Sequence, residues 1–251
     1  MKTAIITGAS SGLGREYAVQ LAEAFPEVEC VWLIARRKPL LDELAGTIKI
    51  KTETIALDLC SDTDLDILAR RLADEKPEVT MLINCAGCGY LSNVEDTDPA
   101  LLTRMTDLNM RAMTAVTRIA LPYMRAGGHI INVSSIASFC PNARMTVYSS
   151  TKAYVSSFSL GLREELRDRK ISVTAICSGP MATEFLDIGG ITGNSQMFKT
   201  LPYCDPQKVA AGSYKAAKAD RAFYTPRAFF KLYRGLAKII PHTILVKLAK
   251  T

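Results

Sequence analysis

The sequence predicts an α/β fold: one Rossmann-type, doubly wound parallel sheet of about seven strands. Short apolar, β-rich runs recur along the chain, and helical patterns separate almost all of them. This alternation implies parallel pairing, right-handed crossovers and helices on both faces of the sheet. The predicted strands are residues 3–7, 28–35, 52–57, 80–84, 128–135, 171–177 and 222–225.

Length and composition agree with this fold class. The chain has 251 residues, of which 48% are hydrophobic and 22% charged, enough for one large core. No run of 18 apolar residues occurs and only two residues precede the first apolar stretch, so we expect a cytoplasmic protein. Seven scattered cysteines fit reduced thiols. Because Cys85 and Cys88 lack a second pair at zinc-ligand spacing, we expect no metal site.

The positive charge is concentrated at the carboxyl end. Residues 226–251 hold six Lys or Arg and no acidic residue, whereas basic and acidic residues balance over residues 1–225. The body of the chain therefore offers no basic stripe for nucleic acid. We expect residues 1–225 to form one domain, with a lid at about 185–204 and an amphipathic extension, 226–251, packed on the same domain.

A glycine-rich turn, TGASSGLGR, follows the first predicted strand and opens the first helix. Gly8, Gly12 and Gly14 would let the backbone approach a pyrophosphate at a helix N-terminus. The same letters contain G-x-S-x-G, the nucleophile elbow of serine hydrolases, with Ser10 as nucleophile and His242 as the downstream base. That alternative leaves the Tyr148 and Lys152 pattern described below without a role.

The second predicted strand ends in IARRK. A site that prefers NAD places Asp or Glu at this strand end to bind the ribose 2′-hydroxyl. Arg36, with Arg37 behind it, matches a 2′-phosphate instead, because guanidinium pairs with phosphate oxygens in a fork. The sequence therefore predicts NADP(H) as the cofactor.

Tyr148 and Lys152 stand four residues apart in VYSSTKAYV, so on a helix their side chains share one face. A tyrosine does little proton chemistry at neutral pH, but a nearby ammonium favours the phenolate and lowers its pKa. We therefore expect Lys152 to lower the pKa of Tyr148.

Together these motifs resemble the short-chain dehydrogenase/reductase family, in its single-domain branch of about 250 residues. The resemblance runs from Thr3 to about Thr225 and includes NCAG at 84–87, LNMRA around Asn109, and INVSS, which places Ser135 thirteen residues before Tyr148. SGPMATEF at 178–185 resembles the stretch that packs on the nicotinamide, with Ser178 where the family usually has proline.

The resemblance implies an NADP(H)-dependent oxidoreductase that interconverts a secondary alcohol and a ketone. Tyr148 would be the general acid or base, and Lys152 would lower its pKa and bind the nicotinamide ribose. Ser135 would bind the substrate oxygen, and Asn109 would hold a water linked to Lys152. The implied cofactor residues are Gly8, Ser10, Ser11, Gly12, Leu13, Gly14, Arg36, Arg37, Asp58, Leu59, Asn84, Ala86, Gly87, Tyr148, Lys152, Gly179, Pro180, Met181 and Thr183. A non-catalytic dinucleotide sensor is the alternative.

The substrate is expected to be bulky and apolar, such as a hydroxysteroid or a 3-oxoacyl compound, because apolar residues dominate the predicted site and lid. Relatives in the family form dimers or tetramers through the helix that carries Tyr148, so a homodimer or homotetramer is expected. The residues expected around the substrate are Tyr90, Ser138, Phe139, Met145, Phe185, Leu186, Ile191, Met197, Phe198 and Tyr203.

The carboxyl-terminal segment predicts an amphipathic helix that starts near Pro226 and ends before Pro241. One stripe is apolar: Phe229, Leu232, Tyr233, Leu236 and Ile239. We expect this stripe to dock over the substrate cleft or a sister subunit. The alternative lays the helix on an anionic membrane surface through the same stripe and its basic residues.

Overall fold

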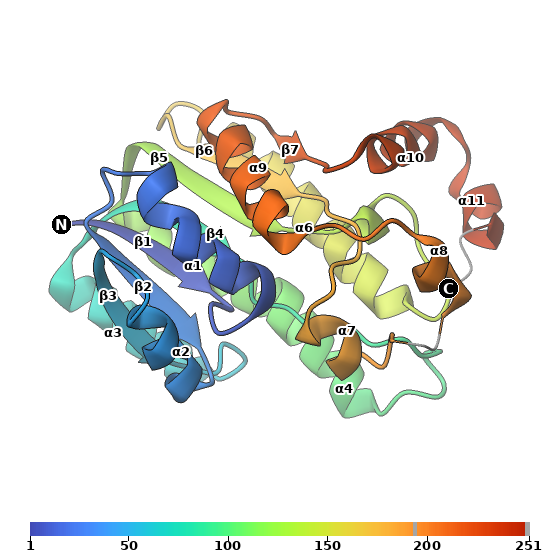
Figure 1. The fold of residues 1–251 in the computed structure, drawn as a ribbon, viewed down its shortest axis with the longest axis horizontal. Helices are drawn as coiled ribbons and strands as arrows, with labels where there is room; N and C mark the ends of the chain where they lie inside the picture. Colours follow the sequence, from blue (N-terminus) through green and yellow to red (C-terminus); the bar gives the residue numbers. More distant parts are fainter. Residues whose placement is uncertain (193–194, 249–251) are drawn as a thin grey trace.

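Seven parallel strands form one sheet, in the order β3-β2-β1-β4-β5-β6-β7, in the computed structural model (Figure 1), which describes residues 1–192 and 195–248. The predicted lid residues 193–194 and the predicted extension residues 249–251 lie outside the described part. The strands are β1 (Lys2–Thr7), β2 (Cys30–Ala35), β3 (Lys51–Ala56), β4 (Glu78–Asn84), β5 (Met124–Val133), β6 (Ser172–Ile176) and β7 (Phe223–Tyr224).

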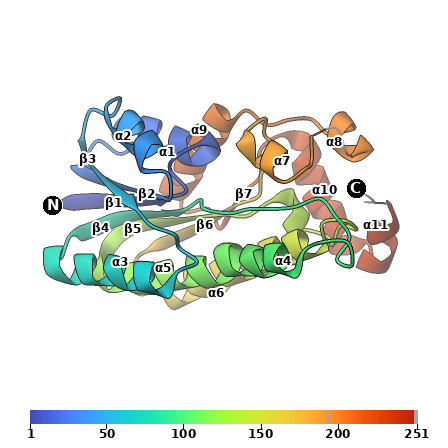
Figure 2. The same ribbon diagram turned by 90° about the horizontal axis from the view of Figure 1, so that it is seen from below.

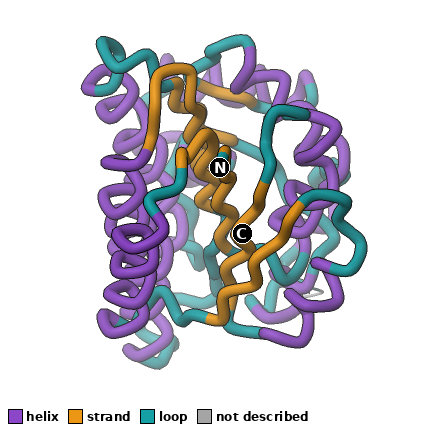
Figure 3. The backbone as a smooth tube through the Cα atoms, turned by 90° about the vertical axis from the view of Figure 1, so that its left-hand side faces the viewer, coloured by secondary structure: helices purple, strands orange, loops and turns teal. Residues whose placement is uncertain are grey.

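Helices cover both faces of this sheet and make three layers. In Figure 2, α1, α2 and α9 lie on one side and α3, α5 and α6 on the other, and Figure 3 shows the same layers from the amino-terminal end. The α-helices are α1 (Gly12–Ala24), α2 (Lys38–Ala45), α3 (Asp62–Glu75), α4 (Pro99–Thr106), α5 (Met113–Ala120), α6 (Thr146–Glu165), α7 (Glu184–Ile188), α8 (Gln196–Thr200), α9 (Pro206–Lys218), α10 (Ala228–Ile239) and α11 (His242–Leu248).

The predicted fold class is confirmed, and each predicted strand is present. The largest differences are at the ends: β5 begins at Met124 instead of 128, and β7 has only two residues. The register between β4 and β5 shifts between Val79 and Met81, next to the Gly127 and Gly128 pair that lies early in β5. Glycines in this position weaken the apolar pattern, which explains the late predicted start.

Two apolar layers hold the helices to the sheet. Residues such as Ile6, Leu33 and Ile83 pack against α1 and α9, and residues such as Trp32, Leu82 and Ile130 pack against α3, α5 and α6. Because strands β1, β2 and β4 are apolar on both faces, they suit a sheet covered by helices on each side.

The strand order places a crevice at the carboxyl edge of the sheet. The chain runs β1, β2, β3 outward in one direction and then crosses to β4, which pairs with the other side of β1. Ligands of doubly wound sheets bind where the order reverses, at the carboxyl ends of the strands. The fold therefore positions the ends of β1 and β4 and the start of α1 around a single opening.

Between α4 and α5 the chain winds through a π-helical turn, η1 (Asp107–Ala112), which contains Asn109. A π-helical turn inserts an extra residue into the helix and is often found at functional sites. Two short 3-10 turns, η2 (Leu121–Tyr123) and η3 (Ile136–Ser138), precede and follow β5.

The helix expected at the carboxyl end is α10, but only part of the expected apolar stripe docks on the domain. Of the expected stripe, Tyr233 packs beside Phe139, whereas Leu232 and Ile239 face outward and are 65% and 81% exposed. The helix also packs through Phe230 and Ala237, which are buried. Phe230 lies in the same core layer as α1 and α9, and a Cβ atom on Gly179 would stand 2.3 Å from its ring. Because Gly179 has no side chain, the loop after β6 accepts this ring, and that contact selects the docked face.

Among the described residues, no helix combines the length and the apolar character needed to cross a membrane.

Two adjacent phenylalanines on α10 provide a test of this packing. We predict that Phe230→Ala lowers the free energy of unfolding by about 3–5 kcal/mol, because it removes a fully buried ring from the core. Phe229→Ala, the matched control, removes a ring that is 54% exposed and is expected to change stability by less than about 1 kcal/mol. Urea unfolding of both variants measures the difference, and equal losses would contradict the docked face described here.

Candidate active site

A cavity of about 810 Å³ opens at the carboxyl edge of the sheet and extends from the end of β2 to α10 and α11. Every residue implied by the family resemblance lines it except Asn84 and Asn109. Four segments predicted from the sequence therefore line the same cavity: the glycine-rich turn, the end of β2 with Arg36 and Arg37, helix α6 with Tyr148 and Lys152, and the SGPMATEF loop.

The glycine-rich turn is packed so closely against neighbouring backbone that Gly8 and Gly14 leave no space for a side chain. Gly8 has φ +69°, and a Cβ atom there would lie 2.8 Å from the Ala86 backbone at the end of β4. A Cβ atom on Gly14 would lie 2.1 Å from the Gly8 carbonyl oxygen. The turn thus packs against β4 and opens α1 directly beneath the cavity, as a nucleotide diphosphate requires.

The amino end of α1 is suited to an anion. Its first turn holds no acidic residue, and the N-cap residue Ser11 makes no side-chain capping hydrogen bond. Arg37 donates to Ser10 Oγ at 3.2 Å and to Ser11 Oγ at 2.9 Å. The helix dipole and a guanidinium therefore meet at the same turn, which favours a bound phosphate.

Arg37 also reaches the segment after β6. Its guanidinium forms an ion pair with Glu184 at the start of α7, at 2.9 Å. Arg36 is exposed, lines the cavity and lies near Asp58. Of the two arginines that the sequence offers for a 2′-phosphate, Arg37 is thus held by Ser10, Ser11 and Glu184, whereas no residue of the described chain forms an ion pair with Arg36.

Asp58 and Leu59 line the cavity after β3, next to Arg104 of α4. Arg104 pairs with the Asp58 carboxylate at 3.0 Å. Partial burial acts to raise the pKa of Asp58, but the Cys60 backbone N–H and the Arg104 guanidinium outweigh it and hold that pKa below its usual value. Arg104 was missed by sequence reasoning, because nothing in its local pattern shows that α4 reaches this strand end.

Asn84 lies beneath the cavity and not in its lining. It was expected to touch the cofactor but does not line the cavity. Its amide donates to Asn132 Oδ1 at 2.8 Å and to Thr117 Oγ1 at 3.0 Å, and its side chain is buried between β4, β5 and α5. The Asn84 amide nitrogen thus ties the ends of β4 and β5 together beneath the cavity.

Asn109 lies behind the cavity wall. Its Oδ1 accepts from the Cys88 backbone N–H at 2.9 Å, and its Nδ2 donates to the Cys88 carbonyl at 2.8 Å and to Thr151 Oγ1 at 3.0 Å. These bonds join the π-helical turn, the segment after β4 and α6. The side chain therefore fixes the backbone that faces Lys152, while its predicted water-holding role stays a prediction.

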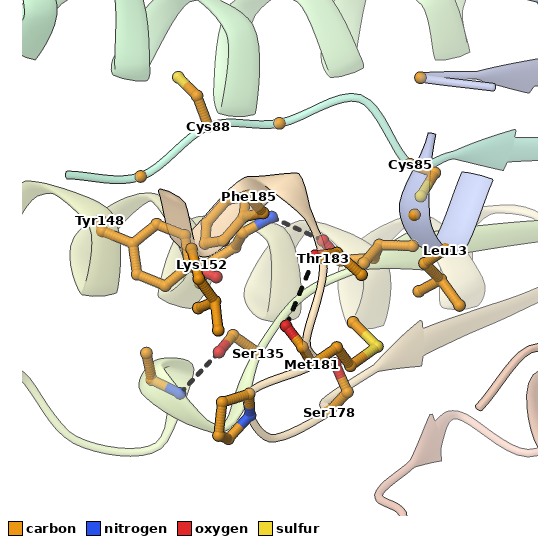
Figure 4. Close-up of a pocket in the computed structure, with 18 of the residues that line it drawn as sticks. Leu13, Cys85, Cys88, Ser135, Tyr148, Lys152, Ser178, Met181, Thr183 and Phe185 are labelled. Carbon is orange, nitrogen blue, oxygen red and sulfur yellow. Dashed lines mark hydrogen bonds between the residues drawn. The ribbon is translucent and has the colours of Figure 1, made fainter. Parts of the chain in front are cut away.

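Ser135, Tyr148 and Lys152 lie together in the cavity, as Figure 4 shows. Tyr148 and Lys152 occupy the buried face of α6, one turn apart. Lys152 Nζ donates to the Val133 carbonyl at 2.9 Å and stands 5.7 Å from the centre of the Tyr148 ring. Ser135 begins η3, where its Oγ accepts from the Ala137 N–H at 3.1 Å. Ser134, its neighbour, instead donates to the Lys152 carbonyl at 2.9 Å.

Burial controls both pKa values of the pair. Loss of water raises the pKa of Tyr148 to about 12, and the Ser135 hydroxyl acts in the opposite direction. Loss of water lowers the pKa of Lys152 to about 8. The expected net lowering of the Tyr148 pKa is therefore not found in this structure, because the cost of burial outweighs any gain from the Lys152 charge.

The far part of the cavity is apolar. Phe185 of α7 packs beside Tyr148, with ring centres 5.7 Å apart. Of the residues expected around the substrate, Ser138, Phe139 and Tyr203 do not line the cavity. Those that do are Tyr90, Met145, Phe185, Leu186, Ile191, Met197 and Phe198. Phe229 and Tyr233, two residues of the stripe expected to dock over the cleft, also line it. Further lining residues that sequence reasoning did not name include Ala137, Asn142, Leu201, Phe230 and Leu245.

The serine hydrolase alternative is contradicted by the site. Neither histidine lines the cavity, and Ser10 Oγ accepts a hydrogen bond from Arg37. His242 contacts the Ala237 carbonyl on α10, while His129 bonds to Ser172.

Cys85 and Cys88 point away from each other in Figure 4, and no group of three or more potential metal ligands occurs among the described residues.

A parallel sheet with a glycine turn at its switch point defines a nucleotide-binding α/β protein. The chain belongs to the short-chain dehydrogenase/reductase family: the family model described as short chain dehydrogenase matches residues 2–188. The resemblance noted in the sequence is thereby confirmed, and this is a family of oxidoreductases acting on alcohol and carbonyl groups.

Relatives of known sequence include an uncharacterized oxidoreductase of Staphylococcus epidermidis, 29% identical over 75% of this chain and 83% of its own length. The very-long-chain 3-oxoacyl-CoA reductase of Homo sapiens is 33% identical over 74% of this chain, which corresponds to only 61% of its own length.

Two solved structures share the whole fold. A short-chain dehydrogenase from Sphingobium yanoikuyae in complex with NADPH has a TM-score of 0.77 at 26% identity, covering 96% of this chain and 97% of its own. The bulky-bulky ketone specific alcohol dehydrogenase from Comamonas testosteroni has a TM-score of 0.72 at 26% identity, covering 96% and 95%.

The opposite pKa shifts of Lys152 and Tyr148 predict how stability changes with pH. The pKa of Lys152 falls from 10.5 to about 8 on folding, so between these values the unfolded chain binds a proton that the folded chain has released. Stability contributed by this group therefore rises with pH over that window, by about 3 kcal/mol in total. The raised pKa of Tyr148 acts in reverse, so stability falls above pH 10.

Urea unfolding from pH 7 to pH 10 measures the Lys152 effect. Wild type is expected to gain stability relative to Lys152→Met as pH rises above about 8. Lys238→Met, which changes an exposed lysine of α10, serves as the control and should track wild type. Parallel curves for wild type and Lys152→Met would show that the buried amine keeps its ordinary pKa.

Proposed function

We propose that this protein is an NADP(H)-dependent oxidoreductase that interconverts a secondary alcohol and a ketone on a bulky apolar substrate. The observation that carries the proposal is the buried cluster of Ser135, Tyr148 and Lys152 facing a glycine turn across one cavity. The dinucleotide, when bound, supplies or accepts the hydride. The residues of this chain bind it, orient the substrate and move one proton.

Three segments of the chain bind the dinucleotide in this proposal. The turn of Gly8, Gly12 and Gly14 with the start of α1 receives the diphosphate. Arg36 receives the 2′-phosphate, and Asp58 and Leu59 flank the adenine end. The cradle fits such a ligand, because a side chain on Gly87 would stand 3.4 Å from the Lys152 amine and close the backbone approach. The NADPH complex of the Sphingobium relative supports this proposal.

Proton transfer falls to Tyr148. With a pKa near 12 it is protonated at neutral pH, so it donates its hydroxyl proton to the substrate oxygen during ketone reduction. Lys152, whose pKa of about 8 keeps it largely charged at pH 7, stabilises the phenolate that this transfer produces. Ser135 Oγ donates to the same substrate oxygen and stabilises its developing charge. Asn109 positions the segment that faces Lys152.

The apolar end of the cavity determines the substrate class in this proposal. Its walls are Met145, Leu186, Ile191, Met197 and Phe198, with Phe185 beside Tyr148. Apolar walls with a few polar groups at one end orient a ligand with its carbonyl toward those groups. The names of the human 3-oxoacyl-CoA reductase and the Comamonas bulky-ketone enzyme agree with this class.

Assembly as a homodimer or homotetramer through α6 stays a prediction. Leu160 of α6 is 47% exposed, as a contact between copies would require, while Ser159 and Leu162 belong to the interior. Sedimentation velocity measures the assembly state, and a monomer at all concentrations would contradict it.

The Tyr148 hydroxyl is expected to be required for turnover. We predict that Tyr148→Phe lowers kcat for ketone reduction by at least about 100-fold, because it removes the proton donor. NADPH affinity, measured by fluorescence, should change little. Tyr154→Phe is the matched control on the same helix: its hydroxyl bonds to Thr114 outside the cavity, so turnover should persist. Full activity of Tyr148→Phe would contradict the role of Tyr148 as proton donor. NADPH binding by the unmodified protein without any turnover would favour the sensor alternative.

The cofactor preference tests Arg36. We predict that the unmodified protein has a higher kcat/KM with NADPH than with NADH, because a charge-assisted hydrogen bond to the 2′-phosphate contributes about 1.5–3 kcal/mol. Arg36→Asp should reverse the preference. Arg118→Asp makes the same charge change at an exposed position on α5 and should leave it intact. A preference of the unmodified protein for NADH would show that the end of β2 does not read the phosphate.

Substrate size tests the apolar end. For a series of 3-oxo compounds with growing alkyl chains, kcat/KM with NADPH should rise by about fourfold per buried methylene, or ~0.8 kcal/mol, until the cavity is filled. Small charged carbonyl compounds should be poor substrates. If those compounds are preferred, the apolar walls cover the core instead of binding the substrate.

A further inference from the structure

The exposed face of α10 carries a continuous apolar row. Phe229, Leu232, Leu236 and Ile239 follow one another at spacings of three and four residues and are between 42% and 81% exposed. We call these four residues the α10 row. Single exposed apolar side chains are ordinary, but side chains at this spacing lie side by side on a helix. The start of α11 adds Ile244, which is 53% exposed.

The row is not needed to hold α10 in place. The helix packs on the domain through Phe230 and Ala237, and through Tyr233, whose ring lies beside Phe139. Arg234 on that side lies over the Phe223 ring at 4.0 Å. The buried and the exposed apolar faces are therefore distinct, and the exposed one remains available to a partner outside the domain.

The charge around the row selects the partner. Lys231 and Lys238 are exposed on α10, and Lys247 is exposed on α11. Residues 226–251 contain no acidic residue. A second copy of the same face would bring like charges together, which is unfavourable, whereas an anionic surface would be attracted. Apolar side chains with flanking lysines match the interface of a bilayer that contains anionic lipids.

The row is also continuous with the cavity. Phe229, the first residue of the row, also lines the cavity. Tyr233 of α10 and Leu245 of α11 lie outside the row and line the cavity next to it. Figure 1 shows α10 and α11 together beyond the carboxyl edge of the sheet, at the end of the molecule away from the amino terminus. A surface bound by the row would therefore lie at the apolar end of the cavity.

We propose that the α10 row and its flanking lysines dock this protein reversibly on anionic membrane surfaces, with the apolar end of the cavity opening toward the bilayer. Docking itself needs neither cofactor nor catalysis. Under the function proposed above, an apolar ketone or alcohol dissolved in the bilayer would reach Tyr148 without crossing water.

Co-sedimentation with vesicles tests the docking. The full chain is expected to bind vesicles of equal parts phosphatidylcholine and phosphatidylglycerol, to bind phosphatidylcholine alone at least tenfold more weakly, and to lose affinity as salt increases. The row variant, Leu232→Ser with Leu236→Ser and Ile239→Ser, should bind at least tenfold more weakly. The charge variant, Lys231→Gln with Lys238→Gln, should also weaken binding and reduce its salt dependence.

A matched control changes three other exposed apolar residues, Val19→Ser, Ile67→Ser and Leu101→Ser, on α1, α3 and α4. It should bind vesicles like the unmodified chain. Failure of the unmodified chain to bind, or equal binding by the row variant and this control, would overturn the proposal. So would a lower mass of the row variant in lipid-free sedimentation velocity, because that result would make the row a contact between copies.

The outcome is separable from the proposed activity. The three row positions changed here do not line the cavity, so reduction of a water-soluble ketone should be unchanged in the row variant. Vesicle binding is measured without NADPH or ketone. A chain that binds vesicles but reduces no ketone would retain the docking proposal and contradict only the proposed function.

Discussion

A buried amine joins the parts of the candidate site. Lys152 Nζ donates to the Val133 carbonyl at 2.9 Å, which ties the middle of α6 to the last residue of β5. This contact fixes the rotation of α6 and directs Tyr148, one turn earlier, into the cavity beside Ser135. Removing a charged amine from water is unfavourable, and the lowered pKa of Lys152 reflects that cost. Burial of Lys152 therefore costs the fold stability, and groups with strongly shifted pKa values often mark functional sites.

Close backbone contact is the second requirement, and it explains why the site lies where it does. The turn after β1 and the segment after β4 meet at Gly8 and Ala86. The backbones that follow these two neighbouring strands are therefore in direct contact. Behind this contact, Asn84 and Asn132 bond across β4 and β5, and Asn109 holds Cys88. These three asparagines hold the strand ends and the segment after β4 together without lining the cavity themselves. Gly179 is a further example: because it has no side chain, the Phe230 ring packs directly against its backbone, and this contact holds α10 on the domain.

Much of this arrangement could be predicted from the sequence. Alternating strands and helices predicted the sheet, and local motifs such as TGASSGLG and VYSSTKAY carry their own geometry, because neighbours in sequence are neighbours in space. What could not be predicted depends on contacts between distant segments. Only part of the predicted face of α10 docks, because periodicity shows two apolar faces but not which one meets Gly179. The place of Asn84 beneath the cavity could not be predicted because its partners, Asn132 and Thr117, lie far away in the sequence. The pKa of Tyr148 was wrong because burial cannot be read from a spacing of four residues.

The central claim is that the buried pair of Lys152 and Tyr148 performs chemistry on a carbonyl group rather than stabilising the domain. Stopped-flow measurement of NADPH oxidation, with saturating long-chain 3-oxo compound and a single turnover, tests it most directly in Lys152→Met. The account predicts that hydride transfer slows by at least about 100-fold, since no charge stabilises the Tyr148 phenolate, while the variant remains folded. Hydride transfer at the unmodified rate in Lys152→Met would contradict the account.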